Sequence, residues 1–258
     1  MISEEIKLKE YLDRKFDYYN RPSFIDKDPI SIPHRFSKRA DVEIAGFFAA
    51  IFAWGQRKTI INKTNDLLAR MDDAPFDFIM NHSAADLKKI EGFVHRTFND
   101  ADALYFIQFF KEHYSRYKSL ETAFTIFLSP EDETVEHALI GFRDYFFSWD
   151  HLKRTEKHIA TPKKQSACKR INMFLRWMVR ADEKGVDFGL WNNIKPSQLL
   201  CPLDVHVLRV AQRLGMIDTD KSDFKTLIKL NEQLKNFDPL DPVKYDFALF
   251  GVGVEEKF

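Results

Sequence analysis

The sequence predicts an all-α fold, and three observations support that prediction. Phenylalanine is unusually frequent, with 25 copies, whereas Gly and Pro are scarce, with 9 and 10 copies. Apolar residues recur every three or four positions along most of the chain, which is the spacing of one helix face. No stretch alternates apolar and polar residues for long enough to predict a sheet. Many large aromatic side chains and few helix breakers suit helices that pack against one another.

The first strongly marked helix begins near Asp41. Asp is a favoured N-cap residue, and Ile44, Phe47 and Ile51 follow on one predicted helix face. Gly215 is a natural stop for the amphipathic helix before it. The later predicted helices cover residues 103–118, 134–147, 170–182, 205–214, 222–236 and 243–250.

Two segments, 20–35 and 183–203, are loop-like, and the chain has no internal repeat or obvious linker. We therefore expect residues 1–258 to form a single unit. The second loop-like segment lies between two well-marked helices, where functional residues often gather.

Composition and charge restrict the function. Apolar residues make up 45% and charged residues 30% of the chain, as in ordinary globular proteins. The net charge is zero, so nucleic-acid binding would depend on a local basic patch. Two cysteines cannot form a four-thiolate cluster, and the histidines show no paired ligand spacing. We expect no metal, no iron–sulfur cluster and no other cofactor.

The sequence also lacks several recognisable signals. It has no P-loop, no dinucleotide-binding glycine motif and no Gly-x-Ser-x-Gly. The charged N-terminal stretch does not resemble a signal peptide, and no apolar run is long enough to span a membrane. We expect a cytoplasmic monomer that does not bind membranes.

The segment from Pro202 to Val210 is the most informative in the chain. Asp204 stands at the start of a strongly amphipathic helix, after a proline that favours an extended entry. The simplest interpretation is that Asp204 is only an N-cap. The alternative is that the Asp204 carboxylate is catalytic. The residues around Asp204 support this alternative.

The string PLDVHVLRVAQRLGM resembles the catalytic signature of the helix-hairpin-helix DNA glycosylases, the superfamily of endonuclease III and the 8-oxoguanine glycosylases. Asp204 matches the essential aspartate of that signature, His206 the following His, and Arg209-Val210 its Arg-Val pair. The whole chain also resembles an uncharacterised bacterial family, DUF2400, thought to be a distant branch of this superfamily. The resemblance implies two helical lobes, one from both chain ends and one from the middle, with the active site in the cleft between them.

Two weaker matches extend the resemblance. Residues 41–60 are similar to an early helix of the superfamily that ends in a glutamine-containing turn facing DNA, and Gln56 matches that glutamine. The alternative is that Gln56 is a solvated residue at a helix end. Residues 243–251 resemble the last helix before an optional iron–sulfur loop, and we expect no such loop here.

The hairpin is where the chain departs from the superfamily. Its usual pattern, Leu-Pro-Gly-x-Gly-x-Lys, uses glycines to bring backbone N–H groups close to a phosphate. Residues 160–170 contain no glycine, which puts that role in doubt. Lys169 stands where the resemblance expects the hairpin lysine, which is the nucleophile of the bifunctional members. Its simplest alternative is a solvated lysine in a basic run.

That basic run contains seven Lys or Arg residues and one Glu between residues 151 and 170. At helical spacing, Arg176 and Arg180 continue it along the face of Lys169. Such a run is either a solvated surface or a phosphate-binding face. The predicted phosphate contacts are Lys163, Lys164, Arg170, Arg176 and Arg180, together with Gln56.

The resulting hypothesis is a DNA base-excision glycosylase, with or without lyase activity, that acts on a flipped-out damaged base in duplex DNA at the nucleoid. Asp204 and Lys169 would be its catalytic residues. The alternative is a non-catalytic nucleic-acid or protein binder that retains the fold. Trp54, Trp149, Trp177 and Trp191 are more typical of a core than of base stacking, and Trp191 is the first to test for stacking because it precedes Asp204.

Overall fold

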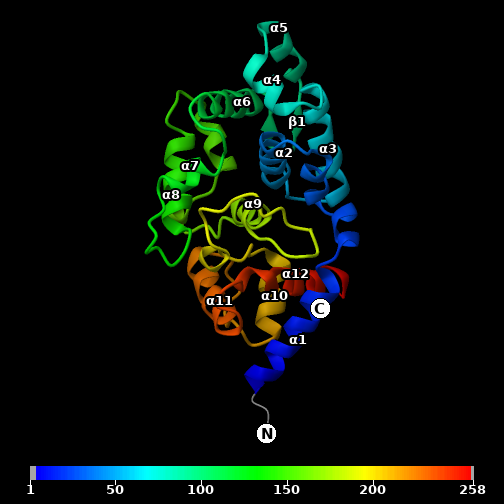
Figure 1. Ribbon diagram of the computed structural model, residues 1–258, viewed down its shortest axis with the longest axis vertical. Coiled ribbons are helices and arrows are strands. Elements are labelled where there is room, and N and C mark those ends of the chain that lie inside the picture. The colour runs from blue at the N-terminus through cyan, green and yellow to red at the C-terminus, as the bar shows by residue number, and fades with distance from the viewer. Residues whose placement is uncertain (1–3, 257–258) are drawn as a thin grey trace. The chain divides into compact units, whose positions relative to one another are not determined.

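The computed structural model describes residues 4–256, and helices dominate it (Figure 1). The strands in that range are β1 (Val94–His95) and β2 (Phe98–Asn99), which pair antiparallel with Val94 opposite Asn99. The all-α prediction is therefore confirmed. The chain divides into two compact units, described separately below.

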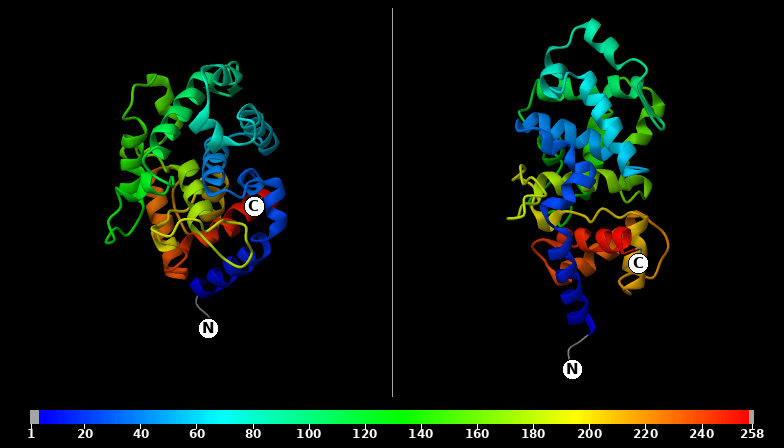
Figure 2. Two further views of the ribbon diagram at one scale, coloured as in Figure 1. Left: turned by 45° about the horizontal axis from the view of Figure 1, so that its top comes forward. Right: turned by 90° about the vertical axis from the view of Figure 1, so that its right-hand side faces the viewer.

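Unit 1 draws on both ends of the chain and comprises Met1–Phe24, Ser129–His137 and Thr161–Phe258. Its last helix, α12 (Tyr245–Glu255), is mostly apolar around its circumference. It packs against the first helix, α1 (Glu4–Tyr19), and against α10 (Val205–Arg213), which follows Asp204 (Figure 2). Such a helix is expected to be buried, and most of its residues are. The helices of unit 1 are α1 (Glu4–Tyr19), η6 (Pro162–Lys164), α9 (Lys169–Val179), η7 (Pro196–Gln198), α10 (Val205–Arg213), α11 (Phe224–Phe237), η8 (Pro242–Lys244) and α12 (Tyr245–Glu255).

Unit 2 comprises Ile25–Leu128 and Ala138–Ala160. Its core is built from phenylalanines: the rings of Phe106 and Phe146 lie 4.8 Å apart, and those of Phe124 and Phe142 stack at 4.1 Å. The helices here are η2 (Pro29–Ser31), η3 (Pro33–Arg35), α2 (Arg39–Ile51), α3 (Arg57–Arg70), α4 (Pro75–Asn81), α5 (Ala84–Leu87), η4 (Lys88–Ile90), α6 (Asp100–Tyr114), α7 (Thr122–Thr125) and η5 (Lys153–His158), while η1 (Pro22–Lys27) and α8 (Glu136–Phe146) cross between the units.

Most helix boundaries lie within a few residues of the predicted ones, but the start of α2 does not fit the prediction. The helix begins at Arg39, so Asp41 stands inside its first turn instead of capping it. The Asp41 carboxylate accepts a hydrogen bond from the Phe76 backbone N–H at 2.9 Å. At α6, the cap is Asn99, whose side chain and that of Asp102 form a reciprocal capping box.

Candidate functional site

Asp204 is the N-cap of α10, as the simplest interpretation expects. Its Oδ1 accepts hydrogen bonds from the backbone N–H groups of His206, at 2.8 Å, and Val207, at 3.0 Å. Within residues 4–256, no group donates a hydrogen bond to Oδ2. The side chain is half-buried. One oxygen of this carboxylate therefore holds the helix start, and the other remains available to a ligand.

Lys169 is the first residue of α9 and is also half-buried. Its Nζ lies 3.5 Å from the sulfur of Met173, which is a weak acceptor. In the part of the chain that the structure describes, no carboxylate lies within ion-pair distance of this ammonium. No salt bridge would have to break before this amine could act on a ligand.

Asp246, on α12, connects these two residues. It is 4% exposed, accepts a hydrogen bond from Nη1 of Arg176, and lies 4.0 Å from the sulfur of Cys201. Burial raises the pKa of Asp246 to about 6; Arg176 opposes that rise, the negative charge of Asp204 adds to it, and Lys169 opposes it. The charges of Asp204 and Lys169 therefore both influence this one buried carboxyl group.

Arg176 and Arg180 correct the predicted phosphate-binding face. They are only 3% and 2% exposed, so neither can reach a phosphate on the surface. Arg176 Nε lies 3.2 Å from one oxygen of Asp187, and Arg180 Nη1 lies 3.2 Å from the other. Arg176 lies in α9, but the helix ends at Val179, so Arg180 is its C-cap with an extended backbone. Both side chains are buried in unit 1, where acidic side chains neutralise them.

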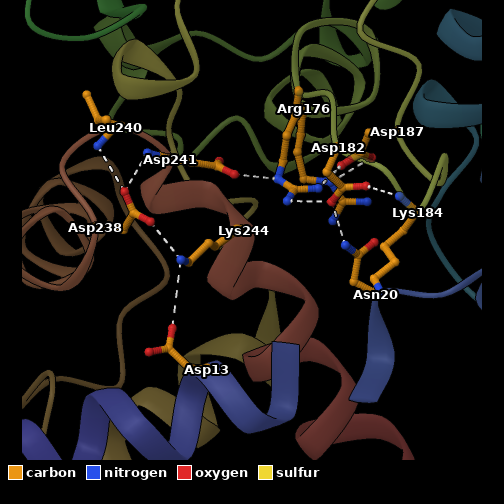
Figure 3. A network of polar contacts seen from close by, with 11 residues as sticks. Asp13, Asn20, Arg176, Asp182, Lys184, Asp187, Asp238, Leu240, Asp241 and Lys244 are labelled. Carbon is orange, nitrogen blue, oxygen red and sulfur yellow. Dashed lines mark hydrogen bonds and ion pairs between the residues drawn. The ribbon is translucent and has the colours of Figure 1, made fainter. Parts of the chain in front are cut away.

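The wider network around these arginines crosses several elements of unit 1 (Figure 3). Arg180 also pairs with Asp241 at 2.9 Å and with Asp182 at 2.8 Å. Arg176 lies over the ring of Phe247, with 4.3 Å between the guanidinium carbon and the ring centre. Buried charges of this kind need all of their partners, because an unpaired buried charge is strongly destabilising.

Residues 160–170, where the resemblance expects a hairpin, adopt two left-handed backbone conformations without glycine. Lys163 and Lys164 are exposed in η6, whose N-cap is Thr161. Gln165 and Cys168 have φ angles of 57° and 49°, in the left-handed region that glycine normally supplies. Lys169 and Arg170 follow directly. Partial burial lowers the pKa of Arg170 to about 10, so it stays charged near neutral pH.

Two residues of the quoted signature have a packing role. Arg209 Nη2 donates a hydrogen bond to the carbonyl of Gly253 at 2.7 Å, near the end of α12. A Cβ at Gly253 would lie 3.0 Å from that of His206, so the glycine permits close contact between α10 and α12. His206 and Arg209 therefore contribute to the packing of α10 against α12.

The remaining predicted residues lie elsewhere. Gln56 is exposed in unit 2, at the N-cap position of α3, and its side chain makes no capping hydrogen bond. Trp191 is 1% exposed and packs against Phe174, so it is a core residue and not a stacking surface. Trp54, which no pattern had favoured, is partly exposed instead.

The structure also bears on metals and membranes. Over residues 4–256, no group of three or more His, Cys, Asp or Glu side chains is arranged to hold a metal ion. No helix in the same range combines the length and the apolarity needed to cross a bilayer.

The fold and the site together define an all-helical protein in which an aspartate and a lysine stand at two helix starts and influence the same buried carboxyl group. The sequence model of one family, described as "Protein of unknown function (DUF2400)", matches residues 28–255. The chain therefore belongs to the DUF2400 family. A search of curated proteins and a search of solved structures each gave no match.

Proposed function

We propose that this protein is a DNA glycosylase that removes a damaged base from duplex DNA, with Lys169 as nucleophile and Asp204 as its carboxylate partner. One observation carries the proposal. Within residues 4–256, Lys169 is an ammonium without an ion pair at the start of α9, and Asp204 is a carboxylate with one oxygen free of hydrogen bonds at the start of α10; both charges influence the buried carboxyl group of Asp246. The resemblance of the Asp204 segment to the glycosylase signature supports the same assignment, and such an enzyme would work at the nucleoid.

The chemistry follows from these two groups. The neutral amine of Lys169 attacks C1′ of the flipped nucleotide, the C1′–N bond breaks with its electron pair, and the base leaves after taking up a proton. Asp204 stabilises the positive charge that develops on the sugar and accepts the proton that the amine loses. Asp204 then returns this proton to O4′ as the C1′–O4′ bond breaks, and opening of the sugar ring gives a protonated imine between Lys169 and C1′.

Borohydride trapping tests this mechanism. Hydride adds to the imine carbon and leaves a permanent bond between the protein and the DNA. We expect the wild-type protein to form such an adduct with at least one duplex from a panel of damaged and abasic oligonucleotides. Lys169→Arg should bind the same duplex and give no adduct, because Arg keeps the charge but stays protonated.

Lys163→Arg and Lys164→Arg are the matched controls, since both lysines are exposed nearby and should still allow trapping. If one of these variants loses the adduct and Lys169→Arg keeps it, the nucleophile is that other lysine, and the protein is still a glycosylase. If wild type traps no duplex, release of free base must be measured, because water can replace the amine as nucleophile. A negative result in both assays would contradict the proposal.

The second candidate is a nucleic-acid binder that has kept the fold without the chemistry. The packing role of His206 and Arg209 favours it, because that role alone explains part of the signature. This candidate predicts DNA binding without either adduct or free base.

Both candidate functions predict that the lysines of η6 contact DNA phosphates. Changing Lys163 and Lys164 together to Glu should weaken DNA binding, because the two side chains are exposed and precede the α9 start. The slope of log K against log salt should fall by about one for each lost phosphate contact. The same change at Lys225 and Lys229, exposed on α11, alters the net charge equally and should leave the slope unchanged. If both double variants have the same salt-dependence slope, η6 is an ordinary solvated surface that does not contact DNA.

A further inference from the structure

An exposed arginine lies over a partly exposed tryptophan in unit 2. The guanidinium carbon of Arg96 is 4.6 Å from the centre of the Trp54 ring. Across residues 4–256, no carboxylate comes within ion-pair distance of Arg96. The charge of this side chain is therefore not neutralised within the described part of the chain.

The local fold holds Arg96 in this place. Arg96 is in the turn between β1 and β2 with a φ angle of 56°, a left-handed conformation that is unfavourable for a long side chain. On one side of the turn, His95 Nε2 lies 3.1 Å from the Phe52 carbonyl at the end of α2. On the other side, Arg154 donates a hydrogen bond to the Thr97 carbonyl at 2.8 Å.

Gly55 leaves the space that the guanidinium occupies. A Cβ at this position would lie 2.6 Å from Nη1 of Arg96, so any larger residue would displace the arginine. The stacked pair therefore depends on the turn conformation, on two anchoring hydrogen bonds and on a glycine.

A second Arg–Trp pair in the same unit provides a comparison. Arg116 lies over Trp149 at 5.8 Å, and its Nη2 is 3.3 Å from a carboxylate oxygen of Glu112. The positive charge of Arg116 is therefore neutralised by Glu112, four residues earlier. Arg96 has the contact with the ring but, among the described residues, no carboxylate within ion-pair distance.

We propose that Arg96, supported by Trp54, binds an unpaired nucleotide of a nucleic-acid strand. A guanidinium plane stacks on a nucleobase, and its N–H edge donates hydrogen bonds to a phosphate, so one side chain recognises both parts of a nucleotide. Exposed Gln56 and Lys58 follow Trp54 in the chain and add polar and positive groups. An acidic peptide would satisfy the charge but would offer no base to stack. The inference rests on the proposed function only in that the partner is a nucleic acid.

Binding of a fluorescently labelled oligothymidylate to the full-length protein tests this inference by anisotropy. We expect Arg96→Ala to weaken binding about ten-fold or more, which is the usual effect of removing one stacking side chain. Arg96→Lys should keep the salt dependence of wild type and still lose affinity, because it preserves the charge without the plane. Arg116→Ala should bind as wild type does.

Two further measurements separate stacking from plain charge. A strand of the same length without bases should show a much smaller difference between wild type and Arg96→Ala. An equal difference for both strands, or equal affinities for Arg96→Ala and Arg116→Ala, would overturn the inference. Displacement by polyglutamate as effective as displacement by oligothymidylate would also overturn it, because it would indicate an acidic polypeptide partner.

Failure of this inference can be distinguished from failure of the proposed function. If Arg96→Ala loses binding while no adduct or free base is ever detected, the chemistry assigned to Lys169 fails and the nucleotide contact stands. If trapping succeeds and the Arg96 substitution has no effect on binding, the proposed function stands and this inference fails. A wild-type protein that binds no oligonucleotide would contradict the inference directly.

Discussion

Asp204→Asn should reduce base excision by about 10²–10⁴-fold, the usual contribution of a positioned carboxylate that transfers a proton, and leave thermal melting close to that of wild type. Asn caps helices about as well as Asp, and its Oδ1 can accept the same hydrogen bonds from His206 and Val207. The substitution removes the charge and replaces the free Oδ2 by an amide. Excision kinetics and a melting curve on the same preparation separate the two roles.

Asp223→Asn is the matched control, because Asp223 caps α11 through the Thr226 backbone N–H at 2.9 Å. It should change neither excision nor melting appreciably. Wild-type excision by Asp204→Asn would mean that the carboxylate is only a cap. An Ala variant is less informative, since loss of a cap alone costs about 1 kcal/mol.

Arg176→Ala should lower the free energy of unfolding by about 3–5 kcal/mol, the cost of breaking a buried ion pair by removing one partner. The substitution leaves Asp246 without its arginine and Asp187 with Arg180 alone. It also removes the guanidinium that lies over Phe247. Denaturant unfolding followed by circular dichroism measures the change.

Lys229→Ala serves as the surface control and should change stability by less than about 0.5 kcal/mol, because its pair with Asp218 is exposed. Adding Asp246→Asn to Arg176→Ala should recover part of the loss, since an amide needs no counter-ion. A small effect of Arg176→Ala, similar to that of Lys229→Ala, would contradict the burial of this network.

The helices could be predicted from the sequence because the repeat of apolar residues is a local signal. Gly215 ends α10 with a φ angle of 70°, as its place after the last apolar residue predicts. Asp41 shows the limit of that approach. Its residue type suits a cap, yet its carboxylate binds the backbone of Phe76, 35 positions away, and no local pattern contains that contact.

The candidate site was predicted only in part for the same reason. Asp204 and Lys169 stand at helix starts, which local patterns reveal. The partners that bury Arg176 and Arg180 come from distant segments, so the spacing along α9 could not distinguish a solvated face from a neutralised one. Asp246 lies in residues 243–251, whose resemblance to the last helix of the superfamily gave this residue no role. Arg96 depends on a turn conformation that its residue type does not predict.

The packing of α1 against α12 has a consequence for synthesis on the ribosome. Tyr19 donates a hydrogen bond to Glu256, and the two residues are 237 positions apart. At translation rates of about 5–20 residues per second, α1 emerges roughly 12–50 s before its partner. All residues of unit 2 emerge within that interval, so unit 2 can fold while unit 1 still lacks α12. The apolar residues of α1 that α12 covers must therefore stay soluble on the nascent chain until α12 has been synthesised.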